Sequence, residues 1–264
     1  MADSIAAAAY EATPARFRAA LKTGLALAHF HFSESATQCE ESVFSGRLGF
    51  ARAADCSPAP WALIVFSPAY AAAARLTAVC AACLLAGVPQ VAALCLGGVP
   101  QAAALVSLEL SGVEDIFQPE ATAFGALLDE LAARPGAQGR VVILHGDELD
   151  AVAQASRERG IPTWVECRPP TLRIEPGAAI DREALAFAHG GRQALDAALA
   201  TAGPVDALFR AASAPLGPAP NARLTLWPGC EGFWLHPGLD PAFFTVTRQA
   251  FAPWAPRAVE SPAS

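Results

Sequence analysis

Residues 61–98 read WALIVFSPAYAAAARLTAVCAACLLAGVPQVAALCLGG, and this stretch decides the fold class. Its first six residues form a continuous apolar run that ends at Ser67-Pro68, as expected for a strand buried on both faces. A helical run over 71–86 stops at Gly87, and a second apolar strand, 91–96, stops at Gly97. A strand, a helix and a strand joined by short turns predict a right-handed βαβ unit with parallel strands.

The same alternation continues along the chain. We predict helices over 100–111, 121–133 and 148–159, and strands over 115–117, 140–144 and 163–166. After Pro169-Pro170 the pattern changes to a helix over 181–202, a Pro/Gly-rich loop over 214–220, and extended segments over 223–227, 232–235 and 243–249. The sequence therefore predicts an α/β fold with a Rossmann-like parallel sheet and a second, smaller α/β part.

The predicted domains follow from these elements. An amphipathic helix over 14–31 belongs to an N-terminal helical arm, 1–45. A first Rossmann-like domain spans 46–135, a second α/β part spans 136–252, and the tail 253–264 is expected to be disordered.

Composition narrows the class of protein. The chain has 264 residues, of which 53% are hydrophobic and 16% charged, and this excludes a chain that is disordered throughout. A net charge of -7 without a basic stripe argues against nucleic-acid partners. The uncharged stretch 76–108 is cut by glycines and prolines into pieces shorter than the ~20 residues that cross a bilayer. Because Met1 to Ser4 lack a basic region, we expect no export signal and a cytoplasmic protein.

The seven cysteines are an odd number and lie in apolar contexts. Cys80 and Cys83 have the spacing of a redox or metal pair. They lie within a helical run that has no second cysteine pair and no histidine nearby, so packing in the core is the favoured interpretation.

Parallel sheets bind ligands at the carboxyl ends of their strands. Gly97-Gly98 at one such end could bring amides close to an anion, but a tight turn is the favoured interpretation. At another end, His145 is followed two residues later by Asp147, a pair that could transfer protons. Asp147 could equally cap the helix that begins at Glu148. No dinucleotide-binding glycine motif follows any predicted strand. His189, at a predicted helix end, is expected to interact with the helix dipole.

Several segments, in order, resemble histidinol dehydrogenase, a member of the aldehyde dehydrogenase-like group of folds. They are a helix ending in Phe30-His31, the strand 60–65, the helix 76–88 ending in Ala-Gly-Val, the segment LELSGVEDIF over 108–117, the helix 181–194 and the run 238–249. The segment 108–117 is the most specific match, and the resemblance covers most of residues 16–250.

The resemblance implies NAD-dependent oxidation of histidinol on a zinc site, with a glutamate–histidine acid/base pair and a dimer. His189 matches a zinc-ligating histidine of the family, but the ligating glutamine three residues earlier is Ala186 here. The acid/base pair has no counterpart between Val205 and Pro220, and a substrate-binding Asn-His is Asn221-Ala222. One imidazole cannot supply the donors that zinc requires.

Three hypotheses stay open. The first is a binding or assembly protein on an oxidoreductase scaffold, without histidinol oxidation. The second is an NAD(P)-dependent oxidoreductase of a small substrate, with a different constellation around His145, Asp147 and His189. The third is a small-molecule sensor or carrier with a pocket lined by Tyr70, Gln118 and His145. A small-molecule ligand and a homodimer are the expected partners. The resemblance implies NAD and zinc as cofactors. The residues themselves do not identify the resident cofactor.

Overall fold

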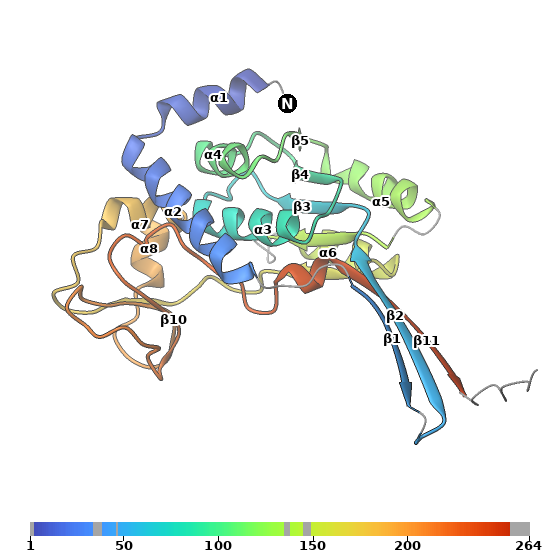
Figure 1. The fold of residues 1–264 in the computed structure, drawn as a ribbon. Coiled ribbons are helices and arrows are strands. Elements are labelled where there is room, and N and C mark those ends of the chain that lie inside the picture. The colour runs from blue at the N-terminus through green and yellow to red at the C-terminus, as the bar shows by residue number, and fades with distance from the viewer. Residues whose placement is uncertain (1–2, 34–38, 46, 135–137, 145–148, 254–264) are drawn as a thin grey trace, which may run out of the picture.

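The computed structural model describes residues 3–33, 39–45, 47–134, 138–144 and 149–253. At its centre is a five-stranded parallel sheet with the strand order β5-β4-β3-β6-β7 (Figure 1). The strands are β3 (Ala62–Phe66), β4 (Val91–Cys95), β5 (Asp115–Phe117), β6 (Arg140–Ile143) and β7 (Thr163–Val165). This confirms the predicted α/β fold with a Rossmann-like parallel core.

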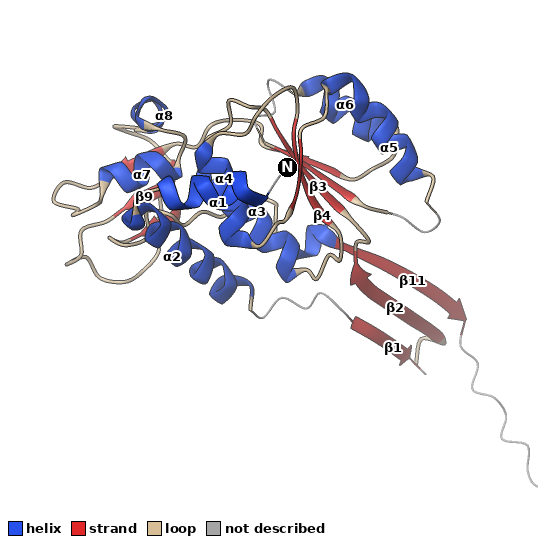
Figure 2. Cartoon of the chain, turned by 90° about the horizontal axis from the view of Figure 1, so that it is seen from above, coloured by secondary structure: helices blue, strands red, loops and turns tan. Residues whose placement is uncertain are grey.

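Helices cover both faces of this sheet, as the view from above shows (Figure 2). The helices α3 (Ala73–Leu85) and α4 (Ala102–Ser111) pack with one set of β3 side chains, which includes Ile64 and Phe66. The helices α5 (Phe124–Ala132), preceded by the 3₁₀ turn η1 (Ala121–Ala123), and α6 (Asp150–Glu158) pack with the alternate set, Leu63 and Val65. Because successive side chains of a strand point to opposite faces, a strand buried on both sides needs the unbroken apolar run of β3.

A second, smaller parallel sheet has the order β10-β9-β8 and is formed by β8 (Leu172–Ile174), β9 (Val205–Phe209) and β10 (Ala222–Leu226). The single helix predicted over 181–202 is wrong. The chain forms α7 (Arg182–Ala188) and α8 (Arg192–Ala198), separated at Gly190 and Gly191, whose φ angles of 104° and 95° are incompatible with a helix. The extended segment 232–235 belongs to no strand, whereas 223–227 corresponds to β10.

A third sheet projects from the body and is antiparallel, with the order β1-β2-β11 (Figures 1 and 2). Its strands are β1 (Cys39–Ser45), β2 (Phe50–Pro58) and β11 (Thr245–Pro253), the last preceded by the 3₁₀ turn η3 (Pro241–Phe244). Away from the body it exposes the apolar side chains of Val43, Phe44, Phe50 and Phe251. The sequence predicted extended chain only for the third of these strands.

Two helices precede this sheet, α1 (Asp3–Ala12) and α2 (Ala15–Phe32), and α2 corresponds to the helix predicted over 14–31. Helix α2 packs on α3 and α7, and so spans the two parallel sheets. Within the described ranges, no helix combines the length and apolarity needed to cross a membrane. The division into domains stays a prediction.

The cysteine pair of α3 lies in the core, as predicted. Both Cys80 and Cys83 are completely buried. Burial raises the pKa of Cys80 to about 12, and burial also raises the pKa of Cys83. The two thiols are therefore protonated at neutral pH and act as small apolar side chains.

Two glycines allow α2 to touch the chain that follows β10. A Cβ atom on Gly24 would overlap the carbonyl oxygen of Gly232, and one on Gly232 would overlap that of Ala20. Since both obstacles are backbone atoms, neither can move aside as a flexible side chain would.

We expect Gly24→Ala to lower the free energy of unfolding by about 1–3 kcal/mol, as overpacked cores do, although alanine alone favours a helix by about 1 kcal/mol. Urea denaturation measures the change. The control is Gly217→Ala, because a Cβ atom there meets nothing within 4 Å. Equal stability of the Gly24 variant and the control variant would contradict the close approach.

Candidate functional site

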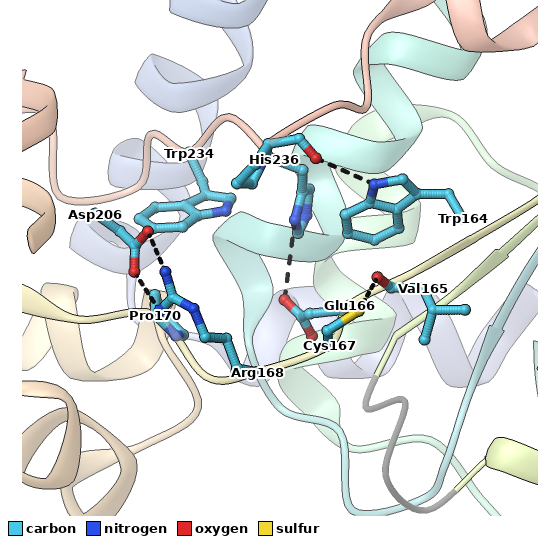
Figure 3. A pocket seen from close by; sticks show the side chains of 10 residues that line it. Trp164, Val165, Glu166, Cys167, Arg168, Pro170, Asp206, Trp234 and His236 are labelled. Carbon is cyan, nitrogen blue, oxygen red and sulfur yellow. Dashed lines mark hydrogen bonds and ion pairs between the residues drawn. The ribbon is translucent and has the colours of Figure 1, made fainter.

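A cleft of about 330 Å³ lies between the carboxyl end of β7 and the second parallel sheet (Figure 3). The segment from β7 onward supplies one wall, β9 supplies Asp206, and the chain after β10 supplies the opposite wall. The lining residues are Trp164, Val165, Glu166, Cys167, Arg168, Pro170, Asp206, Trp234, His236 and Pro237. Its position agrees with the rule that open parallel sheets bind ligands at their carboxyl ends.

A buried ion pair forms part of the cleft wall. Nη1 of Arg75, in the first turn of α3, lies 2.8 Å from Oε1 of Glu166, the residue after β7. Each side chain is only 8% exposed. The Arg75 guanidinium also lies 5.4 Å from the centre of the Tyr70 ring. The pair holds the first turn of α3 against the edge strand of the central sheet.

His236 joins the C-terminal part of the chain to this pair. Its Nε2 lies 2.8 Å from the carbonyl oxygen of Arg75, and its Nδ1 lies 3.9 Å from Oε1 of Glu166. Burial lowers the pKa of His236 to about 4, so the ring is neutral at neutral pH. Because a carbonyl oxygen can only accept, we assign the single ring proton to Nε2.

Two indole rings flank His236 (Figure 3). The Trp164 ring meets the imidazole edge to face at 4.9 Å, and its Nε1 donates to the carbonyl oxygen of Pro237 at 3.1 Å. The Trp234 ring lies on the other side at 6.4 Å. The guanidinium of Arg223 lies 5.0 Å from the centre of the Trp234 ring.

A second ion pair lies at the rim. Arg168 contacts both carboxylate oxygens of Asp206, at 2.8 and 2.9 Å. The carboxylate also accepts from the amide and the hydroxyl group of Thr171. Burial disfavours the charge of Asp206, but the hydrogen bonds from Arg168 and Thr171 outweigh this effect and lower the pKa of the carboxyl group. Asp206 is therefore ionised and fixed in orientation.

The described residues that line the cleft include none of the residues predicted for a site. His145 and Asp147 lie outside the described residues. Tyr70 is buried behind the cleft, while Gln118 is exposed after β5, at the sheet edge opposite β7. The structure therefore does not bring Tyr70 and Gln118 together in one pocket.

His189 lies at the C-terminal end of α7, where it is 2% exposed and meets Trp234 edge to face at 5.4 Å. Within the described part of the chain, neither ring nitrogen has a hydrogen-bond partner. Burial, with a smaller effect of the Arg75 charge, lowers the pKa of His189 to about 3. The expected interaction of a charged His189 with the helix dipole is wrong, because the ring is neutral at neutral pH.

The donors around His189 do not fit the zinc ion that the resemblance implies. Among the residues that the structure describes, no group of three or more histidine, cysteine, aspartate or glutamate side chains could hold a metal. Of the two neighbours that act on the charge of His189, Arg75 is positive at neutral pH and disfavours a nearby cation, while His236 is neutral and adds one donor at most. Tetrahedral zinc needs at least three protein donors.

The Gly97-Gly98 turn has a structural explanation. Gly97 has a φ of 82°, and its amide donates to the carbonyl oxygen of Pro119 at 3.1 Å. A Cβ atom on Gly98 would lie 2.7 Å from Cγ of Pro68. The tight-turn interpretation is confirmed, and the amide of Gly97 is already used within the protein.

Sequence reasoning missed Arg75, Glu166, Trp234 and His236. One signal could have found the first two. Arg75 is the single charged residue in the helical run 71–86, and Glu166 is the charge that ends an otherwise uncharged strand. A lone charge in an apolar element is seldom buried unless it is paired.

No protein-family model and no curated protein sequence matches the chain. Among solved structures, a histidinol dehydrogenase from Elizabethkingia anophelis is similar with a TM-score of 0.59 and 10% identity, over 95% of this chain and 76% of its own. At this identity the likeness shows a shared fold, with a Rossmann-like parallel sheet, and no shared activity.

Two further structures score lower. An oxidoreductase from Marinobacter aquaeolei has a TM-score of 0.42 at 11% identity, over 72% of this chain and 39% of its own. A succinate-semialdehyde dehydrogenase from Burkholderia pseudomallei has a TM-score of 0.38 at 12% identity, over 79% of this chain and 50% of its own.

We expect Glu166→Gln to lower the free energy of unfolding by about 3–5 kcal/mol, because it leaves the buried Arg75 charge without its partner. Chemical denaturation measures the loss. The double variant Arg75→Met, Glu166→Met removes both charges and should lose less. The control is Glu41→Gln, whose exposed pair with Arg52 should contribute little. A Glu166→Gln variant as stable as this control would contradict a buried pair.

Stability should also fall in mild acid. The unfolded chain takes up protons at the ordinary histidine pKa of about 6.5, whereas His189 and His236 resist protonation in the fold down to about 3 and 4. The unfolded state therefore binds more protons than the folded state below pH 6.5. Each histidine then lowers the free energy of unfolding by up to about 1.4 kcal/mol for each pH unit.

Denaturation between pH 7 and pH 4.5 tests this expectation. The free energy of unfolding should be level near pH 7 and decline below about 6.5. In the His189→Phe variant it should decline less steeply. The exposed His29→Gln serves as the control. Parallel curves for the His189→Phe variant and the unaltered protein would show that His189 is not buried in its neutral form.

Proposed function

We propose that the chain binds a small molecule in the cleft beside β7 and does not oxidise histidinol. The observation that carries the proposal is a cleft with aromatic walls whose charged groups, Glu166 and Asp206, are each fixed by an arginine. This pattern, apolar walls with a few fixed polar groups, is typical of ligand sites. The volume of about 330 Å³ suits a molecule of about the size of an amino acid.

The side chains around His189 support the second half of the proposal. Zinc-dependent oxidation of histidinol requires a ligand set that His189 and the neutral His236 do not supply together. We infer that the chain is a divergent relative of histidinol dehydrogenases that keeps the scaffold for binding. The homodimer and the cytoplasmic location stay predictions.

A thermal-shift screen with amino-acid-sized compounds tests the binding function. Binding to the native state alone raises its stability by about 2.7 kcal/mol at a ligand concentration of 100 times Kd, which raises Tm by several degrees. Cys167 is exposed and lines the cleft, so Cys167→Trp should fill it and abolish the stabilisation. Leu216→Trp, at a side chain that is 90% exposed and outside the cleft, should retain it.

A screen without stabilising compounds would contradict the binding function, and so would compounds that stabilise the Cys167→Trp variant equally. Turnover of histidinol by the purified, zinc-loaded protein would contradict the absence of that activity.

An NAD(P)-dependent oxidoreductase is the second candidate, and the shared fold over 95% of this chain favours it. Fold alone does not carry function. Titration calorimetry with NAD and NADP decides between the candidates. Heats of binding that saturate at millimolar concentration or below would favour the oxidoreductase, and their absence would exclude it.

A further inference from the structure

A groove of about 490 Å³ lies between α5 and the outer strands of the central sheet, β4 and β5. It is separate from the cleft beside β7, because β5 and β7 are the opposite edges of the sheet. The strand order explains why the groove forms. Helix α5 connects the edge strand β5 to β6, which lies beyond β3, so the helix must cross the sheet and leaves part of the outer strands uncovered.

Alternate residues of three strands form the floor of the groove. Ala92 and Leu94 of β4 pair with Asp115 and Phe117 of β5, and Ala92 also pairs with Leu63 of β3. Because alternate residues of a strand share a face, all five project toward the side on which α5 packs. A ligand can reach this floor, since the Phe117 side chain is 50% exposed and Ala92 is half-buried.

One side of α5 forms the wall of the groove. Ala123, Leu127, Leu131 and Arg134 line it at intervals of three or four residues, so they lie along one side of the helix and its flanking turns. Leu128, on the neighbouring side, is completely buried in the core. Because Leu127 is half-buried and Ala123 is exposed, a ligand can contact the wall as well as the floor.

The polar side chains of the groove gather at one end, the amino edge of the sheet. Asp115 is the first residue of β5, and Gln90 directly precedes β4. Arg134 follows α5, which brings the chain back to the edge where β6 begins. Asp115 and Arg134 are exposed, and within the described ranges neither charge has an ion-pair partner. The groove therefore offers one negative and one positive group at the same end.

We propose that the groove is a second binding site, for an aromatic α-amino acid. Such a ligand carries both charges at one end, an ammonium group for Asp115 and a carboxylate group for Arg134. Its ring packs on Leu94 and Phe117, where apolar burial and ring pairing favour it. The volume of about 490 Å³ is in the range of small-molecule sites. This inference goes beyond the binding function proposed for the cleft beside β7 and does not depend on it.

Titration calorimetry with four probes tests the ligand class. L-phenylalanine carries the ring and both charges, 3-phenylpropanoate lacks the ammonium group, phenethylamine lacks the carboxylate group, and L-alanine lacks the ring. We expect L-phenylalanine to bind most tightly and each singly charged probe to bind about five-fold more weakly, as exposed charge pairs allow. L-alanine should bind most weakly of all. A singly charged probe or L-alanine that binds as tightly as L-phenylalanine would overturn the inference, and so would the absence of L-phenylalanine binding.

Charge variants then assign the two ends of the amino acid. Asp115→Asn and Arg134→Gln change exposed side chains and should each weaken L-phenylalanine binding about five-fold. Asp115→Asn should also remove the preference for L-phenylalanine over 3-phenylpropanoate, and Arg134→Gln the preference over phenethylamine. The matched controls Glu114→Gln and Arg157→Gln, exposed and outside the groove, should leave both preferences unchanged. A preference that survives in the Asp115→Asn or Arg134→Gln variant would overturn the assignment.

Two filling variants locate the bound amino acid. Ala123→Trp places a large ring in the groove at an exposed position and should abolish L-phenylalanine binding. Cys167→Trp, which fills the cleft beside β7, should leave that binding unchanged. The opposite result would overturn the groove as the site while the binding function of the cleft stands. Binding that neither variant abolishes would also overturn the groove as the site.

Discussion

The buried pair of Arg75 and Glu166 is the constraint on which the geometry of the cleft depends. It connects the helix after the central strand to the end of an edge strand, 91 residues further along the chain. The carbonyl oxygen of Arg75 then holds His236, which lies 161 residues away in sequence. Charges removed from water in this way persist only when each has its partner, so the three segments must assemble together. The pairing of Arg75 with Glu166 thus positions the inner wall of the cleft. The indole rings of Trp164 and Trp234 form the apolar part of the lining.

The sequence predicted those parts of the fold in which burial leaves a simple pattern. β3 and β4 are apolar throughout and α3 carries one charge, Arg75. The three elements end at Ser67-Pro68, Gly97 and Gly87, so their type and order could be read directly. β2 reads FARAADCSP, and its residues are half-buried or exposed in no regular order, which leaves no alternation to detect. β8 reads LRI, so a charged residue interrupts its short apolar run.

The sequence indicated the region in which the cleft lies but not the residues that line it. The cleft lies at the carboxyl end of β7, and topology alone fixes that edge of a parallel sheet. The structural role of Glu166 follows from its contacts with Arg75 and His236. No local pattern in the sequence shows that these three residues meet. Pairing over such separations is tertiary information, which a single sequence does not display. The shared fold with a histidinol dehydrogenase leaves this question open as well, since folds of one class host many different sites.

The pairing of β2 with β11 has a kinetic consequence. Phe50 lies opposite Pro253 and Pro58 opposite Thr245, so this ladder pairs residues that are 187 to 203 positions apart in the sequence. High contact order slows folding, because the entropy of loop closure must be lost before the contacts form. During synthesis, β2 leaves the ribosome long before β11 and until then has one free edge, which is the situation in which nascent chains associate wrongly. The longer this edge waits for β11, the longer the nascent chain is exposed to such association.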